Sequence, residues 1–115
     1  MASIPLNFFR RVSIAVTTTP TVVYTAPSSR AGIILSAVAT NLSATNQVIT
    51  VSVSANGTPN SLYELVKNFT IPAKDAVNIA VGKLVLGTAD QLIISADANS
   101  SVNFTISVLE AVNTQ

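Results

Sequence analysis

The segment QVITVSVS, residues Gln47–Ser54, alternates between apolar and hydroxylated side chains. Ile49, Val51 and Val53 occupy every second position, with threonine and serine between them. Successive side chains of a β-strand point to opposite faces of its sheet. The segment is therefore predicted to be a strand with one face in an apolar core and the other face toward solvent.

The segment VNFTISV, residues Val102–Val108, repeats this alternation near the end of the chain. Between the two segments and before them lie further runs rich in β-branched residues, which read TVVYT, GIILSAVAT, VNIAV, KLVL and QLIISAD. Proline, glycine, asparagine and serine bound these runs, as is typical of turns. No segment repeats apolar residues at the spacing of about 3.6 that marks an amphipathic helix.

These patterns predict an all-β protein of about eight short strands. Strands at this spacing favour a single antiparallel β-sandwich, either jelly-roll or immunoglobulin-like. A chain of 115 residues with 49% apolar content is large enough for one domain with a buried core. We expect the sandwich to span residues 12–115, after an N-terminal arm over residues 1–11.

The expected arm reads MASIPLNFFRR. Pro5 disfavours regular strand pairing around it, while the apolar side chains are too many to leave in water without a purpose. The arm could fold back as an edge strand over the domain's own core, or it could dock on a neighbouring subunit with its arginines at the rim of the contact. On the docking interpretation the partner-binding residues are Ile4, Leu6, Phe8, Phe9, Arg10 and Arg11.

The segment SLYELVKNFTIPAKDAVNI, residues Ser61–Ile79, holds four of the chain's eleven charged residues. We expect one strand over Leu62–Ile71, ended by Pro72 because proline cannot donate to the hydrogen-bond ladder. The next three residues are expected to reverse the chain. Glu64 and Lys67 are three positions apart, so on a regular strand they would lie on opposite sides and form no paired site.

Gly87 separates two apolar runs in KLVLGTADQLIISAD, which predicts a hairpin with a permissive backbone at its turn. Asp90 is expected to cap that turn. A metal loop built on Asp90 and Asp97 would lack ligands, because calcium takes about six to eight oxygens. We expect no metal site and no cofactor.

Composition argues against several functional classes. The chain has no histidine and no cysteine, which removes the usual general base, the thiolate nucleophile and the commonest metal ligands. We therefore expect no enzyme. A net charge of +1 gives no basic patch for nucleic acid, and no apolar run reaches the roughly 18 to 20 residues that span a bilayer. At the N-terminus the arginines follow the apolar residues, the wrong order for a signal peptide.

Charged residues make up only 10% of the chain, against about 25% in an average soluble protein. Depletion of charge is typical of the centre of protein–protein interfaces, because a desolvated ion needs a partner. Low charge and two-faced strands together predict a homo-oligomer, with a trimer favoured.

The order of motifs along the chain resembles the small all-β virion structural proteins of tailed bacteriophages, particularly phages of cyanobacteria and other marine bacteria. The resemblance covers most of the chain. Where that family tends to place glycine after the isoleucine–proline pair, this chain has Ala73-Lys74-Asp75. The matching motifs are Val23–Pro27, Ile34–Ser36, Leu65–Lys67 with Ile71–Pro72, Leu84–Leu92 and Ser107–Glu110.

The resemblance implies a virion component without a catalytic role, made in the cytoplasm of the bacterial host. A capsid cement or decoration protein that binds the major capsid protein is favoured, with a neck, tail-fibre or baseplate module as the alternative. A carbohydrate-binding or receptor-binding module would need exposed aromatic side chains. Tyr63 is the candidate for such a surface contact, although the chain has no tryptophan. A pilus or adhesin subunit would require secretion.

Overall fold

Strands account for most of the residues that the computed structural model describes, which are 7–27, 30–55, 62–79 and 84–112. None of these residues belongs to a helix long and apolar enough to cross a membrane. The described strands are β1 (Asn7–Ala15), β2 (Thr21–Thr25), β3 (Arg30–Asn41), β4 (Gln47–Ser54), β5 (Leu62–Ile71), β6 (Ala76–Asn78), β7 (Leu84–Leu86), β8 (Gln91–Ala96) and β9 (Val102–Val112).

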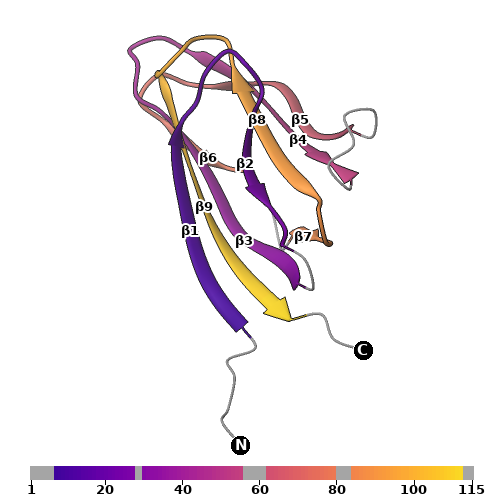
Figure 1. Ribbon diagram of the computed structural model, residues 1–115. Coiled ribbons are helices and arrows are strands. Elements are labelled where there is room, and N and C mark those ends of the chain that lie inside the picture. Colours follow the sequence, from indigo (N-terminus) through magenta and orange to yellow (C-terminus); the bar gives the residue numbers. More distant parts are fainter. Residues whose placement is uncertain (1–6, 28–29, 56–61, 80–83, 113–115) are drawn as a thin grey trace, which may run out of the picture.

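The strands form two antiparallel sheets that pack face to face (Figure 1). One sheet has the order β1-β9-β3-β6, and β7 also pairs with β3, so β6 and β7 follow one another along the same edge of β3. The other sheet has the order β2-β8-β4-β5. This arrangement confirms the predicted antiparallel β-sandwich.

The strand pairing is nested. β1 pairs with β9, β2 with β8, β3 with β6 and β7, and β4 with β5. The nested pairs are rolled up so that β9 also lies beside β3 and β8 beside β4. An immunoglobulin fold would keep its first two strands in one sheet, whereas here β1 and β2 lie in different sheets. The sandwich is therefore a jelly roll.

The core lies between the inner faces of the two sheets, as the alternating sequence patterns predict. Ile49 and Val51 of β4 and Phe104 and Ile106 of β9 are fully buried, and they come from opposite sheets. The buried apolar residues are Val16, Val23, Tyr24, Ala26, Ile34, Ala37, Ala39, Ile49, Val51, Ile71, Leu86, Leu92, Ile94, Val102, Phe104, Ile106 and Val108.

Strand β5 departs from the regular strand that its sequence predicts. Its register against β4 shifts twice, and each shift inserts one extra residue into β5. Because a bulge turns the following side chains to the other face, Glu64 and Lys67 lie on the same side. Their side chains form an ion pair at 3.7 Å. The expectation that they face opposite sides is therefore wrong.

The reversal after β5 follows the prediction. The strand ends at Ile71, and the backbone N–H of Asp75 donates to the carbonyl of Pro72 at 3.1 Å. Lys74 has a φ of 60°, a conformation that favours glycine. Lys74 therefore adopts the backbone geometry that a glycine would ordinarily supply at this turn.

The turn at Gly87 is capped as expected but does not form a hairpin. A carboxylate oxygen of Asp90 accepts from the N–H of Gly87 at 2.9 Å. However, β7 pairs with β3, while β8 pairs with β2 and β4 in the other sheet. The turn therefore carries the chain from one sheet to the other, because the nested topology places neighbouring strands in different layers.

The first strand begins earlier than the expected domain boundary. β1 starts at Asn7 and pairs with β9 without a register shift up to Ala15. Residues 7–11 therefore belong to the sandwich rather than to the arm expected over residues 1–11. Pro5 precedes the strand and so removes none of its hydrogen bonds. Ile4 and Leu6 lie outside the described residues.

Candidate assembly surface

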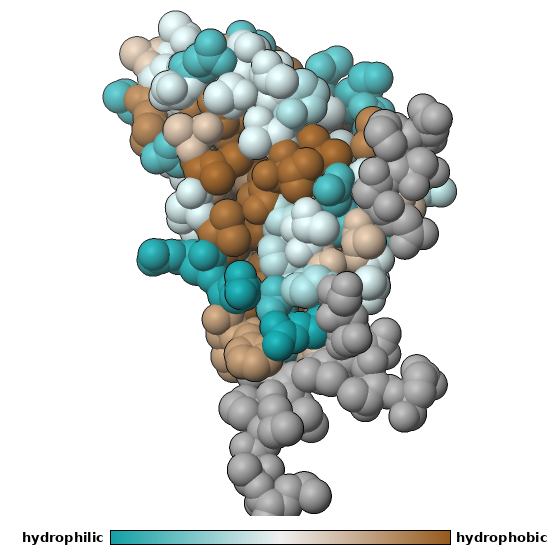
Figure 2. All heavy atoms as spheres, viewed as in Figure 1, coloured by the Kyte–Doolittle hydropathy of each residue, from teal (hydrophilic) through white to brown (hydrophobic). Residues whose placement is uncertain are grey.

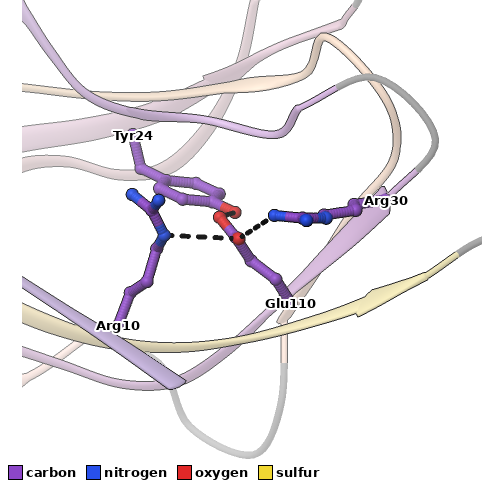
Figure 3. Close-up of polar contacts among 4 residues, drawn as sticks. All are labelled: Arg10, Tyr24, Arg30 and Glu110. Atoms are coloured by element: carbon purple, nitrogen blue, oxygen red, sulfur yellow. Dashed lines mark hydrogen bonds and ion pairs between the residues drawn. The ribbon is translucent and has the colours of Figure 1, made fainter. Parts of the chain in front are cut away.

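A fully buried carboxylate joins four strands at the end of the sandwich where β1 begins and β9 ends (Figure 3). The Tyr24 hydroxyl donates to Glu110 Oε2 at 2.5 Å. Arg10 Nε and Arg30 Nη1 both lie 3.3 Å from Glu110 Oε1. The four residues come from β1, β2, β3 and β9. We call this group the Glu110 cluster.

The cluster also holds the two sheets together. Tyr24 lies on β2 of one sheet, and Glu110 lies on β9 of the other. Gly32, directly opposite Glu110 in the β3–β9 register, makes room for the tyrosine ring, because a β-carbon at Gly32 would lie 2.7 Å from Tyr24 Cε2. A glycine at this position thus lets the ring reach the carboxylate.

Phe8 is fixed by the same cluster. The Arg30 guanidinium lies over the Phe8 ring, 4.3 Å from its centroid, a cation–π geometry. Phe8 and Arg10 are two of the predicted partner-binding residues, and here they contact the chain's own Arg30 and Glu110. Because side chains alternate along a strand, Phe9 between them points to the outer face.

Burial raises the pKa of the Tyr24 phenol well above its usual range, and the hydrogen bond to Glu110 and its negative charge add to the shift. A phenol with a higher pKa in the folded than in the unfolded chain stabilises the fold fully below the unfolded pKa of about 10. That stabilisation is lost as the pH rises toward the folded pKa.

Tyr24→Phe should therefore change how stability depends on pH. At neutral pH we expect a loss of about 1–3 kcal/mol, because the buried Glu110 carboxylate loses a donor. Above about pH 10 the free energy of unfolding of the unaltered protein should fall more steeply than that of the variant. Urea unfolding over this pH range measures both effects. Parallel curves would contradict the role assigned to Tyr24. Tyr63 is exposed and is present in both proteins, so it does not account for a difference between the two curves.

The outer face of the β1-β9-β3-β7 sheet carries a line of apolar side chains at the same end of the sandwich. Phe9 lies opposite Leu109, Leu109 opposite Ile33, and Ile33 opposite Val85. Cross-strand neighbours of this kind have β-carbons about 4.5–5.5 Å apart, so the four side chains form a continuous stripe. Phe9 is 77% and Val85 62% exposed, while Leu109 and Ile33 are half-buried. We call these four residues the apolar row.

Most of the other residues on this outer face are polar, although Val38 of β3 also lies on it, opposite Thr105. Next to the row, Arg11 lies opposite Ser107, and one step further Ser13 lies opposite Thr105. The hydroxyls of Ser13 and Thr105 are 3.1 Å apart. Monomeric proteins rarely expose contiguous apolar patches without a function. The apolar row is therefore the best candidate for a protein–protein contact on this face.

The Glu110 cluster lies directly beneath the apolar row. Phe9 is flanked by Phe8 and Arg10, Leu109 precedes Glu110, and Ile33 follows Gly32. On β1, β9 and β3, each outward residue of the row is adjacent to an inward residue that belongs to the Glu110 cluster or packs against it. The cluster thus fixes the backbone that presents the row.

Other apolar side chains reach the surface elsewhere. Figure 2 shows apolar atoms gathered in the middle of the face where β1, β2 and β8 lie. Val12 and Ile14 on β1 are half-buried, and Val22 on β2 is exposed. Of the predicted contact residues, Arg11 is exposed on the outer face, and Tyr63 is 65% exposed on β5.

Two signals in the sequence point to residues that the predicted site omits. Glu110 continues the inward phase of β9 after Phe104, Ile106 and Val108, so it occupies a core position. Leu109 is the one large apolar residue in the outward phase of that strand. Only the register of the neighbouring strands shows that Leu109 meets Phe9.

Three of the carboxylates in the described residues serve the fold. Asp90 caps the turn at Gly87, and Asp97 Oδ1 accepts from the N–H of Val48 at 3.1 Å. Glu110 is closed off from solvent within its cluster. In the part of the chain that the structure describes, no group of three acidic, histidine or cysteine side chains could hold a metal ion.

No protein-family model matches the sequence, and no curated protein matches it. Several solved structures share the fold. A subunit of the disulfide-linked pili of Bacillus endospore appendages has a TM-score of 0.56 and 9% identity, over 97% of both chains. A chain from the capsid of Helicobacter pylori bacteriophage KHP30 has a TM-score of 0.54 and 10% identity, over 96% of this chain and 90% of that one.

A chain of the T13 IBDV viral particle has a TM-score of 0.57 and 9% identity, over 97% of this chain and 32% of that chain. At such identities the likeness shows a common fold. The chain is thus a single jelly-roll sandwich of the type found in pilus and viral capsid assemblies.

Proposed function

We propose that this protein is a non-enzymatic structural component of a tailed-phage virion, and specifically a cement or decoration protein that binds the major capsid protein. The observation that carries the proposal is the apolar row, which crosses the outer face of a sheet whose remaining outer residues are mostly small and polar. Such a row can dock on a flat surface of a shell. The fold shared with a phage capsid chain over most of both lengths supports this function.

The pilus alternative is less favoured for a chemical reason. The similar pilus subunits form disulfide-linked pili, whereas the 115 residues of this chain contain no cysteine. An assembly of these residues cannot be disulfide-linked, and noncovalent contacts can hold it instead. Apolar packing at the row, with Arg11 at its rim to meet carboxylates of the partner, supplies contacts of that kind.

The attachment surface combines the row with the preceding segment. Ile4 and Leu6 lie a few residues before Phe9 in the sequence. We place these two side chains on the partner together with Phe9 and Arg11, while Phe8 and Arg10 brace the strand from its inner face. The protein is expected to be virion-associated and to self-associate, with a trimer favoured. Sedimentation of the isolated protein at micromolar concentration tests the oligomer.

Phe9→Ser should abolish attachment and leave the fold intact. The side chain is largely exposed, so the free energy of unfolding should change by no more than about 0.5 kcal/mol. Quantitative mass spectrometry of purified virions should find the unaltered protein at a high, symmetry-related copy number, and the variant depleted at least tenfold, for a loss of about 1.4 kcal/mol or more.

Ser13→Ala, on the same strand and face, is the matched control and should attach normally. An undiminished copy number for Phe9→Ser would contradict attachment through the row. A low copy number of the unaltered protein would instead favour the neck, tail-fibre or baseplate alternative. Absence from virions would overturn the virion function.

A further inference from the structure

Strand β1 ends its sheet, and its free side carries a regular series of backbone hydrogen-bonding groups. Just after the strand, the N–H of Val16 donates to the carbonyl of Val102 at 2.8 Å, and this pair continues the unshifted β1–β9 register. In an antiparallel ladder, alternate residues bond to the neighbouring strand, and the residues between them point the other way. The backbone groups that point away from β9 are therefore those of Phe9, Arg11, Ser13 and Ala15. No strand among the described residues pairs with this side of β1.

The other described sheet edges are protected against the addition of a strand. β5 has two register shifts against β4, and β2 has one against β8. β6 and β7 are three residues long each. Bulges and short strands are devices by which natural proteins prevent pairing at sheet edges. β1 has nine residues, no register shift and no proline, so among the described edges it is the one left open to a further strand.

The inner side of this edge is incompletely covered. Val12 and Ile14 point inward from β1, opposite the buried Ile106 and Phe104 of β9. Both pack against the core but are only half-buried, because the sheet ends at β1 and no described strand lies beyond them in it. Apolar atoms gather on the face where β1, β2 and β8 lie (Figure 2). A strand added to β1 would place its own inward side chains beside Val12 and Ile14 and shield them from water.

The same edge carries positive charge on both of its faces. Arg10 points inward, and its side chain is 59% exposed. It shares the Glu110 carboxylate with Arg30, so two guanidinium groups face one carboxylate. Arg11 points outward, is exposed, and forms no ion pair with a described residue. Acidic side chains opposite Arg10 and Arg11 would therefore stabilise an incoming strand.

These requirements disfavour a second copy of this chain as the occupant of the edge. The β1 strand of a second copy would add its own Arg10 and Arg11 to a positive edge, and like charges on paired strands are destabilising. The other described edges of a second copy are bulged or short. Residues 1–6, MASIPL, contain no acid, and Pro5 would remove a donor from the ladder. The occupant that fits is an extended, acidic segment of a different protein.

We propose that β1 takes an extended segment of the major capsid protein as an additional strand, with acidic side chains opposite the two arginines and apolar side chains beside Val12 and Ile14. In strand addition, main-chain hydrogen bonds provide affinity and alternate side chains provide specificity. Phe9 belongs both to the apolar row and to this edge, so the added strand lies next to the attachment surface. The inference rests on the proposed function, because it names the kind of segment that attachment engages.

Ser13→Pro tests the added strand, because it removes an N–H from the open side of β1 and none from the β1–β9 ladder. Proline is accepted on edge strands where its position makes no ladder hydrogen bond. The variant should still unfold cooperatively in urea, and it should be depleted from purified virions at least about tenfold. Ser13→Ala keeps the N–H and is the matched control. Equal attachment of these two variants, with Phe9→Ser depleted, would overturn strand addition and leave attachment through the row standing.

Substitution of Arg11 tests the charge of the segment. Arg11→Glu should be depleted from virions at least about tenfold, whereas Arg11→Lys keeps the charge and should attach. The side chain is exposed, so neither change should alter the free energy of unfolding by more than about 0.5 kcal/mol. Equal attachment of the two variants would contradict an acidic segment.

Hydrogen exchange at single residues tests the contact in the unaltered protein, where no substitution can disturb folding. In the isolated protein the amides of Arg11 and Ser13 should exchange rapidly, while those of Val12 and Ile14 are protected by β9. In the virion the amides of Arg11 and Ser13 should exchange at least about a hundredfold more slowly. Rapid exchange of these amides in attached protein would refute the added strand. Protection that grows with concentration in the isolated protein would show a second copy on the edge and would also overturn the proposal.

Discussion

Replacing Glu110 by alanine is expected to lower the free energy of unfolding by about 3–5 kcal/mol, the usual cost of removing one partner from a buried charged group. The variant leaves the buried Tyr24 hydroxyl without its acceptor and leaves Arg10 and Arg30 facing one another without the carboxylate between them. Urea unfolding at neutral pH measures the loss.

Glu64→Ala is the matched control for this experiment. Glu64 is exposed on β5, where it pairs with the exposed Lys67, so the change should cost less than about 1 kcal/mol. If Glu110→Ala cost no more than this control, the cluster would not hold the two sheets together. Because the cluster lies beneath the apolar row, Glu110→Ala should also weaken attachment to the particle, whereas Glu64→Ala should not.

Phe104→Ala is expected to destabilise the protein by about 3–5 kcal/mol. The ring is fully buried on the inner face of β9, opposite Ala39 of β3 and Ile14 of β1. The inward-facing residues of β3 beside it include Ala37 and Ala39, so these side chains are too small to fill the space that the ring leaves. Chemical denaturation of the isolated protein tests the prediction.

Phe69→Ala provides a comparison with the same change in side chain. Phe69 lies on β5 and is 38% exposed, so its removal leaves a smaller cavity and should cost clearly less than removal of Phe104. A loss below about 1 kcal/mol for Phe104→Ala would show that the register of β9 is wrong. That outcome would also remove the basis for the apolar row, because Leu109 is placed by the same register.

The strands and their faces could be predicted from the sequence because the period of two is a local property of the chain. In β4 and β9 every second residue is apolar, and these residues form the core. The end of β5 at Pro72 and the cap at Gly87 are local in the same sense, since each depends on the backbone chemistry of one residue and its neighbours.

The pairing of strands could not be read in this way. The turn at Gly87 has the composition of a hairpin, yet it joins two sheets, because burial of both apolar faces favours the nested jelly roll over pairing of sequence neighbours. The bulges of β5 bring Glu64 and Lys67 together, and they arise from the fit of β5 against β4. Neither feature leaves a periodic signal in the sequence.

Alternation along the chain by itself determined that this protein is an antiparallel sandwich, and composition determined that it carries little charge. Only the tertiary structure decided where its contact surfaces lie. The apolar row is spread over the sequence between positions 9 and 109. Each of its residues alone resembles an ordinary strand residue. They are Phe9, Ile33, Val85 and Leu109. They form one row because long-range register places them side by side. Register depends on the packing of whole strands, which no short stretch of sequence contains.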